Sequence, residues 1–167
     1  MNRLTAEWKR LFLLPEQDIT EILATATESA PESCQLVSAQ GRARALVIEF
    51  HRPSDWQIIA ELFERVQIDE QLPAPVIAAT QCGYQMWFSL EVPVSCDDGL
   101  GFLTWLKRKY LADIPDGKLS LFPDSASGQN CLPVIPAFDP CSQKWAAFID
   151  PGMGSMFADE PGLDMAP

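Results

Sequence analysis

Two residues with chemically useful side chains stand one residue apart near the middle of the chain. Glu49 follows the apolar residues 45–48, and His51 follows Phe50. Alternate residues of a strand point to the same side, so a strand here would bring the carboxylate and the imidazole together. Such a pair could exchange protons or bind a metal ion. The simpler interpretation, which we favour, is a half-exposed strand-end histidine without a chemical role.

Cys82 is a third candidate, because it lies in a predicted turn at 81–83 and its thiol could act as a nucleophile. No basic residue is close to it in the sequence to lower its pKa, which favours an idle thiol. The chain has five cysteines and no C-x-x-C pair. We therefore expect reduced thiols rather than a zinc site or a disulfide framework.

A hairpin at 75–91 is predicted to hold the centre of the fold. After Gly83, apolar residues alternate with polar ones at the period of a strand. The expected order is strand 44–50, helix 54–67, hairpin 75–91, helix 97–112 and strand 118–122. This β-α-β-β-α-β order predicts an α+β fold of the RRM-like or ferredoxin-like type, with both helices on one face of an antiparallel sheet.

The length of 167 residues predicts one domain. We expect N-terminal helices at 1–33, the RRM-like core at 34–123 and an irregular C-terminal extension at 124–167. The second N-terminal helix would begin near Pro15. Ser54 would cap the helix expected at 54–67. Further short strands are expected at 34–39, 132–135 and 145–149.

The chain is acidic, with a formal net charge of −11 and 12 basic against 23 acidic residues. Nucleic-acid binding depends largely on basic side chains that contact phosphates, so this balance disfavours nucleic acid and favours a protein partner. No apolar run reaches the roughly 18 residues of a membrane span, and no signal-peptide pattern is present. We expect a cytoplasmic protein without a membrane partner.

Three segments in chain order resemble the primase–polymerase domains of the archaeo-eukaryotic primase superfamily, especially the small versions of bacterial mobile elements and defence loci. They read LVIEF, TQCGYQMWF, and LSLFPDSASGQNCLPVIPAF followed by WAAFIDPG. The resemblance spans roughly residues 42–150. It implies a catalytic core built on an RRM-like sheet, in agreement with the order of elements above.

The chain departs from this family at the residues that would carry catalysis. The resemblance implies two metal-binding acids, one residue apart, where the chain has Glu49 and His51. It implies a phosphate-contacting histidine where the chain has Gln85, which cannot carry positive charge. A third acid would be Asp139 or Asp150, and the sequence does not choose between them. A single Glu beside a His is a poor Mg²⁺ site.

Three hypotheses follow. The first, which we favour, is a non-catalytic primase-like accessory or interaction module, in a mobile genetic element, without a cofactor. The second is a nucleotide-binding protein or nucleotidyltransferase with an altered site made of Glu49, His51, Gln85 and Asp139 or Asp150, using Mg²⁺ or Mn²⁺. The third is an acidic partner-binding protein that imitates nucleic acid, which a contiguous acidic face would favour.

Overall fold

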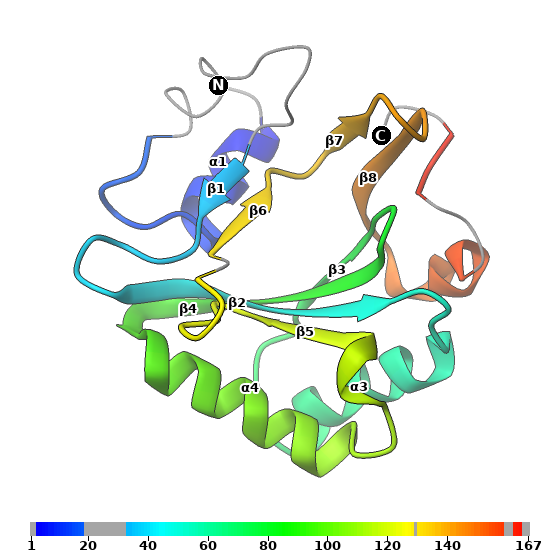
Figure 1. Ribbon diagram of the computed structural model, residues 1–167, viewed down its shortest axis with the longest axis horizontal. Helices are drawn as coiled ribbons and strands as arrows, with labels where there is room; N and C mark the ends of the chain where they lie inside the picture. Colours follow the sequence, from blue (N-terminus) through cyan, green and yellow to red (C-terminus); the bar gives the residue numbers. More distant parts are fainter. Residues whose placement is uncertain (1–2, 19–32, 129, 159–161, 165–167) are drawn as a thin grey trace.

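An antiparallel sheet of six strands forms the centre of the protein (Figure 1). The computed structural model describes residues 3–18, 33–128, 130–158 and 162–164. The sheet has the strand order β5-β2-β4-β3-β8-β7. Its strands are β2 (Arg42–His51), β3 (Val76–Ala79), β4 (Gly83–Ser95), β5 (Leu119–Phe122), β7 (Ala137–Asp139) and β8 (Lys144–Ile149). Two shorter strands, β1 (Ser33–Gln35) and β6 (Cys131–Pro133), pair with each other beside it.

The connections between the strands confirm the predicted core. Helix α3 (Trp56–Ile68) joins β2 to β3, and helix α4 (Cys96–Tyr110) joins β4 to β5. Within the larger sheet these four strands have the order β5-β2-β4-β3, and every neighbouring pair is antiparallel. That is the ferredoxin-like arrangement of an α+β domain. The central position of the β3–β4 hairpin is confirmed as well.

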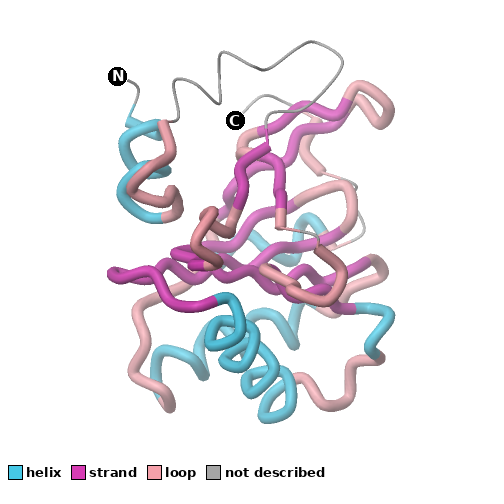
Figure 2. Tube along the Cα trace, turned by 60° about the vertical axis from the view of Figure 1, so that its left-hand side comes forward, coloured by secondary structure: helices cyan, strands magenta, loops and turns pink. Residues whose placement is uncertain are grey.

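The two faces of β4 enter different cores, as its alternating sequence predicted. Tyr84 and Met86 are buried in a core that includes residues of α3 and α4. On the opposite face Trp87 is buried against Trp8 of helix α1 (Arg3–Leu11), with ring centroids 5.3 Å apart. Figures 1 and 2 show α3 and α4 on one side of the sheet and α1 on the other. The site described below lies on the α1 side.

Arg44 connects the end of α1 to the sheet. The pairing of β2 with β4 shifts register between Ala43 and Ala45, which leaves Arg44 at a bulge. Its guanidinium donates to the carbonyl oxygens of Leu13 at 3.0 Å and Leu90 at 3.2 Å, and also to that of Arg10. A cation at a helix C-terminus satisfies carbonyls that have no partner within the helix. This side chain therefore holds α1 over the sheet.

The cap of α3 differs from the prediction by one residue. Asp55, not Ser54, is the N-cap, and its carboxylate accepts from the backbone N–H of Gln57 at 2.9 Å. The hydroxyl of Ser54 instead donates to the carbonyl of His51 at 2.8 Å. Both residue types are good caps, so the backbone path after β2 decides between them. Ser95 is the N-cap of α4, and its hydroxyl accepts from the backbone N–H of Asp98 at 3.1 Å.

The turn between β3 and β4 requires glycine at its end. Thr80 and Gly83 exchange backbone hydrogen bonds across a two-residue loop. Gly83 has a φ of 145°, and a Cβ there would lie 1.9 Å from the carbonyl oxygen of Phe50 on β2. No other residue fits this approach without moving the backbone. The glycine thus fixes how the turn meets β2.

The C-terminal extension is more regular than predicted, which corrects that expectation. Strand β8 pairs with β3 and extends the main sheet, and β7 pairs with β8. The predicted strands at 132–135 and 145–149 are present as β6 and β8, whereas β7 was not predicted. Strand β1, expected at 34–39, is shorter and pairs with β6 rather than with a strand of the six-stranded sheet. The open face of the sheet is therefore partly covered by this extension.

The second predicted N-terminal helix lies mostly outside the described residues. Its proposed start, Pro15, is in a turn, and residues 16–18 are not helical. No helix in the described ranges is long and apolar enough to cross a membrane.

Candidate binding pocket beneath the C-terminal strands

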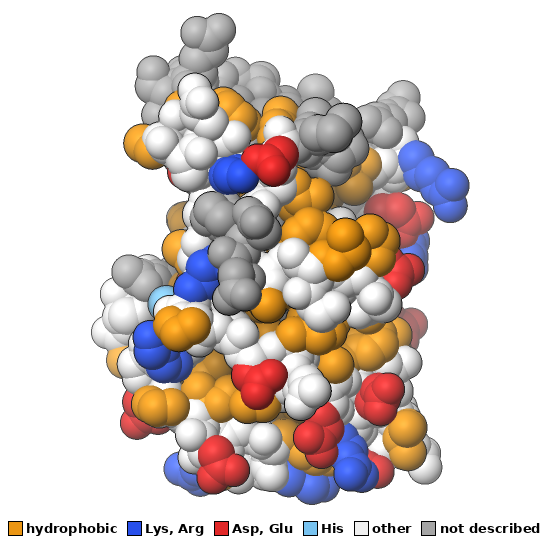
Figure 3. Space-filling model, turned by 90° about the vertical axis from the view of Figure 1, so that its right-hand side faces the viewer, with side chains coloured by type: hydrophobic (Ala, Val, Ile, Leu, Met, Phe, Trp, Pro, Cys, Tyr) orange, Lys and Arg blue, Asp and Glu red, His pale blue; other side chains and the backbone are white. Residues whose placement is uncertain are grey.

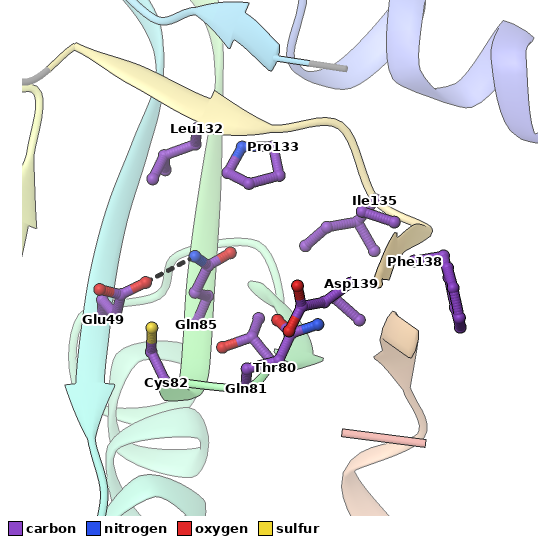
Figure 4. Close-up of a pocket in the computed structure, with 12 residues that line it drawn as sticks. Glu49, Thr80, Gln81, Cys82, Gln85, Leu132, Pro133, Ile135, Phe138 and Asp139 are labelled. Carbon is purple, nitrogen blue, oxygen red and sulfur yellow. Dashed lines mark hydrogen bonds between the residues drawn. The ribbon is translucent and has the colours of Figure 1, made fainter. Parts of the chain in front are cut away.

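A pocket of about 320 Å³ lies between the α1 side of the sheet and the segment that carries β6 and β7 (Figure 4). Its volume falls within the lower part of the range of small-molecule sites. Trp8 supports its roof, because the indole N–H donates to the carbonyl of Ile135 at 2.6 Å. The lining residues are Glu49, Thr80, Gln81, Cys82, Gln85, Leu132, Pro133, Ile135, Ala137, Phe138, Asp139 and Ala146.

A chain of hydrogen bonds forms the polar floor of the pocket. Glu49 and Gln85 are direct cross-strand partners on β2 and β4. The amide nitrogen of Gln85 donates to Glu49 Oε2 at 2.7 Å, and the indole N–H of Trp87 donates to Gln85 Oε1 at 3.1 Å. Gln85 is 3% exposed and Trp87 is fully buried. The Trp87 donor therefore fixes the orientation of the Gln85 amide, with its N–H group toward the carboxylate.

His51 lies next to Glu49, as expected for alternate residues of one strand. Its Nε2 is 3.7 Å from Glu49 Oε1 and 2.7 Å from the hydroxyl of Ser120 on β5. Because the hydroxyl is within hydrogen-bonding distance and Glu49 is not, Ser120 is the principal partner of the imidazole. His51 does not line the pocket itself but a neighbouring hollow with Asp55. The structure thus brings Glu49 and His51 together without a direct hydrogen bond between them.

Of the two candidate third acids, only Asp139 lines the pocket. It is the last residue of β7 and lies on the opposite side of the pocket from Glu49 (Figure 4). Its carboxylate accepts from the hydroxyl and backbone N–H of Ser142, and these hydrogen bonds hold the pKa of Asp139 below its usual range. Asp150 caps the 3₁₀ helix Pro151–Phe157 and accepts from Gly152. The structure therefore distinguishes two acids that the sequence could not.

Cys82 contributes a thiol to the rim, and it has the character expected of an idle cysteine. Burial, together with the nearby Glu49 carboxylate, raises the pKa of Cys82. The nearest guanidinium, that of Arg52, donates to the backbone carbonyls of Thr80 and Gln81 in the turn. It also donates to Phe157 and Ala158, and so braces the turn from outside the pocket.

The hairpin aromatic residues do not form a base-stacking surface. Tyr84 and Trp87 are fully buried and Phe88 is 6% exposed. The hydroxyl of Tyr84 donates to the carbonyl of Gly154 at 2.7 Å. These aromatic side chains are therefore part of the core.

The side chains of this pocket do not fit the two-metal centre of the resembled family. Such a centre needs several oxygen ligands that converge on ions a few Å apart. One oxygen of Glu49 faces an amide N–H, and the carboxylate of Asp139 already accepts from Ser142. In the part of the chain that the structure describes, no group of three or more His, Cys, Asp and Glu side chains could hold a metal ion.

The sequence did not indicate the roof of the pocket. Leu132, Ile135 and Phe138 belong to a segment that contributes to the family resemblance, but nothing in the sequence assigned them to a binding site. Their position depends on contacts between segments far apart in the chain, such as the pairing of β1 with β6. The proline- and apolar-rich run 132–138 was a signal of burial, but not of a pocket.

Comparison with protein-family models gave no match, and comparison with curated proteins gave none either. Among solved structures, the chain is similar to the polymerase domain of Mycobacterium tuberculosis Ligase D, which was solved in complex with DNA. The TM-score is 0.49 and the sequence identity is 15%. The match covers 80% of this chain and 53% of that one, so the chain spans about half the length of the matched chain.

Proposed function

We propose that this chain is a non-catalytic, primase-like domain that serves as an accessory or interaction module for a protein partner. The observation that carries the proposal is the hydrogen bond from Gln85 to Glu49, held in place by Trp87. Glu49 is the acid that would have to bind a metal ion in a primase-like reaction. Its carboxylate instead belongs to a hydrogen-bonded floor in which the donors, the Gln85 amide and the Trp87 indole, are uncharged.

Metal binding at Glu49 would disrupt this floor. An ion that took the Oε2 lone pair used by Gln85 would displace the amide N–H group, a donor on a side chain that is 3% exposed. Leaving a buried donor unsatisfied costs roughly 1–3 kcal/mol. The amide cannot simply rotate, because Trp87 donates to its oxygen. Glu49 is thereby better suited to holding the strands together than to holding an ion.

The lining of the pocket also disfavours a nucleotide as its ligand. Six of the twelve lining residues are Leu, Ile, Phe, Ala or Pro, and the described lining contains no Lys or Arg. Nucleotide phosphates are usually bound by cationic side chains, helix N-termini or metal ions. A pocket with carboxylates at its floor and side, and no cationic side chain in its described lining, has no charged group that would attract an anionic ligand.

The test is a thermal-unfolding titration with ATP, GTP and dNTPs, each with Mg²⁺, Mn²⁺ or EDTA. A nucleotide at 100 times its Kd would stabilise the fold by about 2.7 kcal/mol, which is a shift of roughly 5–10 °C for a domain of this size. We expect no metal-dependent shift at millimolar nucleotide. A shift that Glu49→Ala abolishes and the exposed control Glu91→Ala retains would refute the proposal.

One observation favours the second candidate, a nucleotidyltransferase or nucleotide-binding protein with an altered site. Glu49, Gln85 and Asp139 line one pocket, and His51 lies 3.7 Å from Glu49. The same titration separates this candidate from the first, because it requires metal-dependent nucleotide binding. A positive result would lead to primer-synthesis assays in the presence of Mn²⁺ or Mg²⁺.

The third hypothesis, an acidic protein that imitates nucleic acid, receives no support from the face of the molecule drawn in Figure 3. On the face drawn in Figure 3, acidic side chains are interspersed with basic and apolar ones. Several acids elsewhere are paired with cations, for example Glu70 with Lys109 and Asp69 with Arg65. Imitation of a phosphate backbone would need a regular row of unpaired negative charges.

A further inference from the structure

The pocket has a charge that its own lining does not balance. Two carboxylates, Glu49 and Asp139, line it from opposite sides, and no basic residue is among the described lining. The Glu49 side chain is 12% exposed, so it is largely removed from water. Both carboxylates face the same pocket, and a cation that entered between them would be attracted by both.

Nearby cationic groups do not fill this role. The donors of Arg52 are directed at four backbone carbonyls around the turn and the 3₁₀ helix. Lys144 of β8 forms an ion pair with Asp164. His51 approaches Glu49 only to 3.7 Å and is within hydrogen-bonding distance of Ser120.

The remaining lining defines the shape of the ligand. Leu132, Pro133 and Ile135 form an apolar roof above the polar floor (Figure 4). Phe138, 43% exposed, lies at the outer edge, and its ring centroid is 5.3 Å from that of Trp145. Aromatic faces attract cations, and planar guanidinium groups more often than ammonium groups. The pocket thus suits a flat cation on an apolar stem.

We propose that the pocket binds the guanidinium group and aliphatic stem of an arginine side chain presented by the protein partner. This inference rests on the proposed function, since it names what the partner would place in the same pocket. An arginine stem packs well against apolar walls while its head donates to carboxylates. The net charge of −11 would steer a basic partner toward the chain.

The experiment uses the full chain and N-acetyl-arginine amide, with the citrulline and lysine amides as matched probes. Citrulline has nearly the same shape without the charge. The readout is the indole N–H signal of Trp87 in a ¹⁵N–¹H spectrum, because this group donates to Gln85, the direct partner of Glu49. We expect the arginine probe to shift this signal with a Kd on the order of 1–10 mM, and the other two to bind at least about tenfold more weakly.

Glu49→Gln tests the assignment with little change of shape, since the new amide oxygen can still accept from Gln85. It should weaken arginine binding at least about tenfold, whereas the exposed control Glu91→Gln on β4 should leave it unchanged. If Glu49→Gln does not fold, Asp139→Asn replaces it and should also weaken binding. The inference would be overturned if citrulline bound as well as arginine, or if neither Glu49→Gln nor Asp139→Asn weakened arginine binding. Equal binding of the lysine probe would overturn the choice of a guanidinium group.

The outcome is distinguishable from failure of the proposed function. If the arginine and citrulline probes bind equally well and no nucleotide binds, only the proposal of an arginine pocket is overturned. Metal-dependent nucleotide binding that Glu49→Gln removes overturns the accessory-domain proposal itself.

Discussion

Replacing Gln85 by Met should destabilise the protein through hydrogen bonds rather than through lost volume. The two side chains are similar in length and size, so the cavity contribution is small. Met can neither accept from the Trp87 indole nor donate to Glu49, and both bonds are present in the native protein. The substitution therefore isolates the polar floor of the pocket.

The expected loss follows from the burial of the two partners. Trp87 is fully buried, so its N–H group would remain unsatisfied, at a cost of about 2 kcal/mol. Glu49 is 12% exposed and opens into the pocket, where water can take over part of the lost bond, so about 1 kcal/mol is expected there. The sum, about 3 kcal/mol, is a large part of the stability of a typical domain.

The measurement is urea unfolding followed by tryptophan fluorescence, arranged as a double-mutant cycle with Trp87→Phe. Trp87→Phe removes the orphaned donor in advance. In that background Gln85→Met should cost only about 1 kcal/mol, which gives a coupling free energy of about 2 kcal/mol. A coupling below about 0.5 kcal/mol would show that Trp87 does not fix the Gln85 amide, and the main support for the proposed function would be lost.

Three further predictions concern the turn, the β7–β8 connection and the cysteines. Gly83→Ala should lower the free energy of unfolding, measured with urea, by at least about 3 kcal/mol, because the new Cβ would lie 1.9 Å from a backbone oxygen. The control Gly41→Ala, at a φ of 72° with no atom within 4 Å of the new Cβ, should cost only about 1 kcal/mol in the same assay. Asp139→Asn should destabilise the protein above about pH 3.8, the ordinary pKa of this group, because hydrogen bonds lower the folded-state pKa. The difference from wild type should shrink as the pH falls below 3.8 and vanish once the pH is below the lowered folded-state pKa; urea unfolding across pH measures this. Burial raises the pKa of Cys34 to about 12, so this thiol should not react with a thiol reagent at pH 8 until the chain unfolds. The exposed Cys131 should react in the native state, and peptide mass mapping would distinguish the two.

Local sequence patterns were sufficient for the order of the core elements. The alternation after Gly83 assigned Met86 and Trp87 to opposite faces, and the structure places them in different cores. Strand β7, by contrast, has three residues and an exposed phenylalanine, so it has no apolar pattern of its own. It exists because β8 offers it an unpaired edge. Strands that form only by addition to a partner are invisible to a local pattern.

The same distinction applies to the residues of the pocket. The adjacency of Glu49 and His51 follows from the period of a single strand, and the sequence predicted it. The pairing of Glu49 with Gln85 depends on the register of β2 against β4, which is a tertiary property. The choice of Asp139 over Asp150 depends on how β7 is placed over the sheet. Neither could be derived from spacing along the chain.

The two departures from the resembled family, at His51 and Gln85, are electrostatically compatible with each other. The resemblance implies a second acid at the position of His51 and a histidine at the position of Gln85. Compared with that pattern, the chain has an imidazole in place of the second acid on β2 and a neutral amide in place of the histidine on β4, so one acid and one histidine remain in this region. Gln85 then satisfies the remaining acid, Glu49, as a neutral donor. Restoring only the acid, by His51→Asp, would place two carboxylates side by side without a cation, and we expect this variant to be less stable at pH 7 than at pH 5.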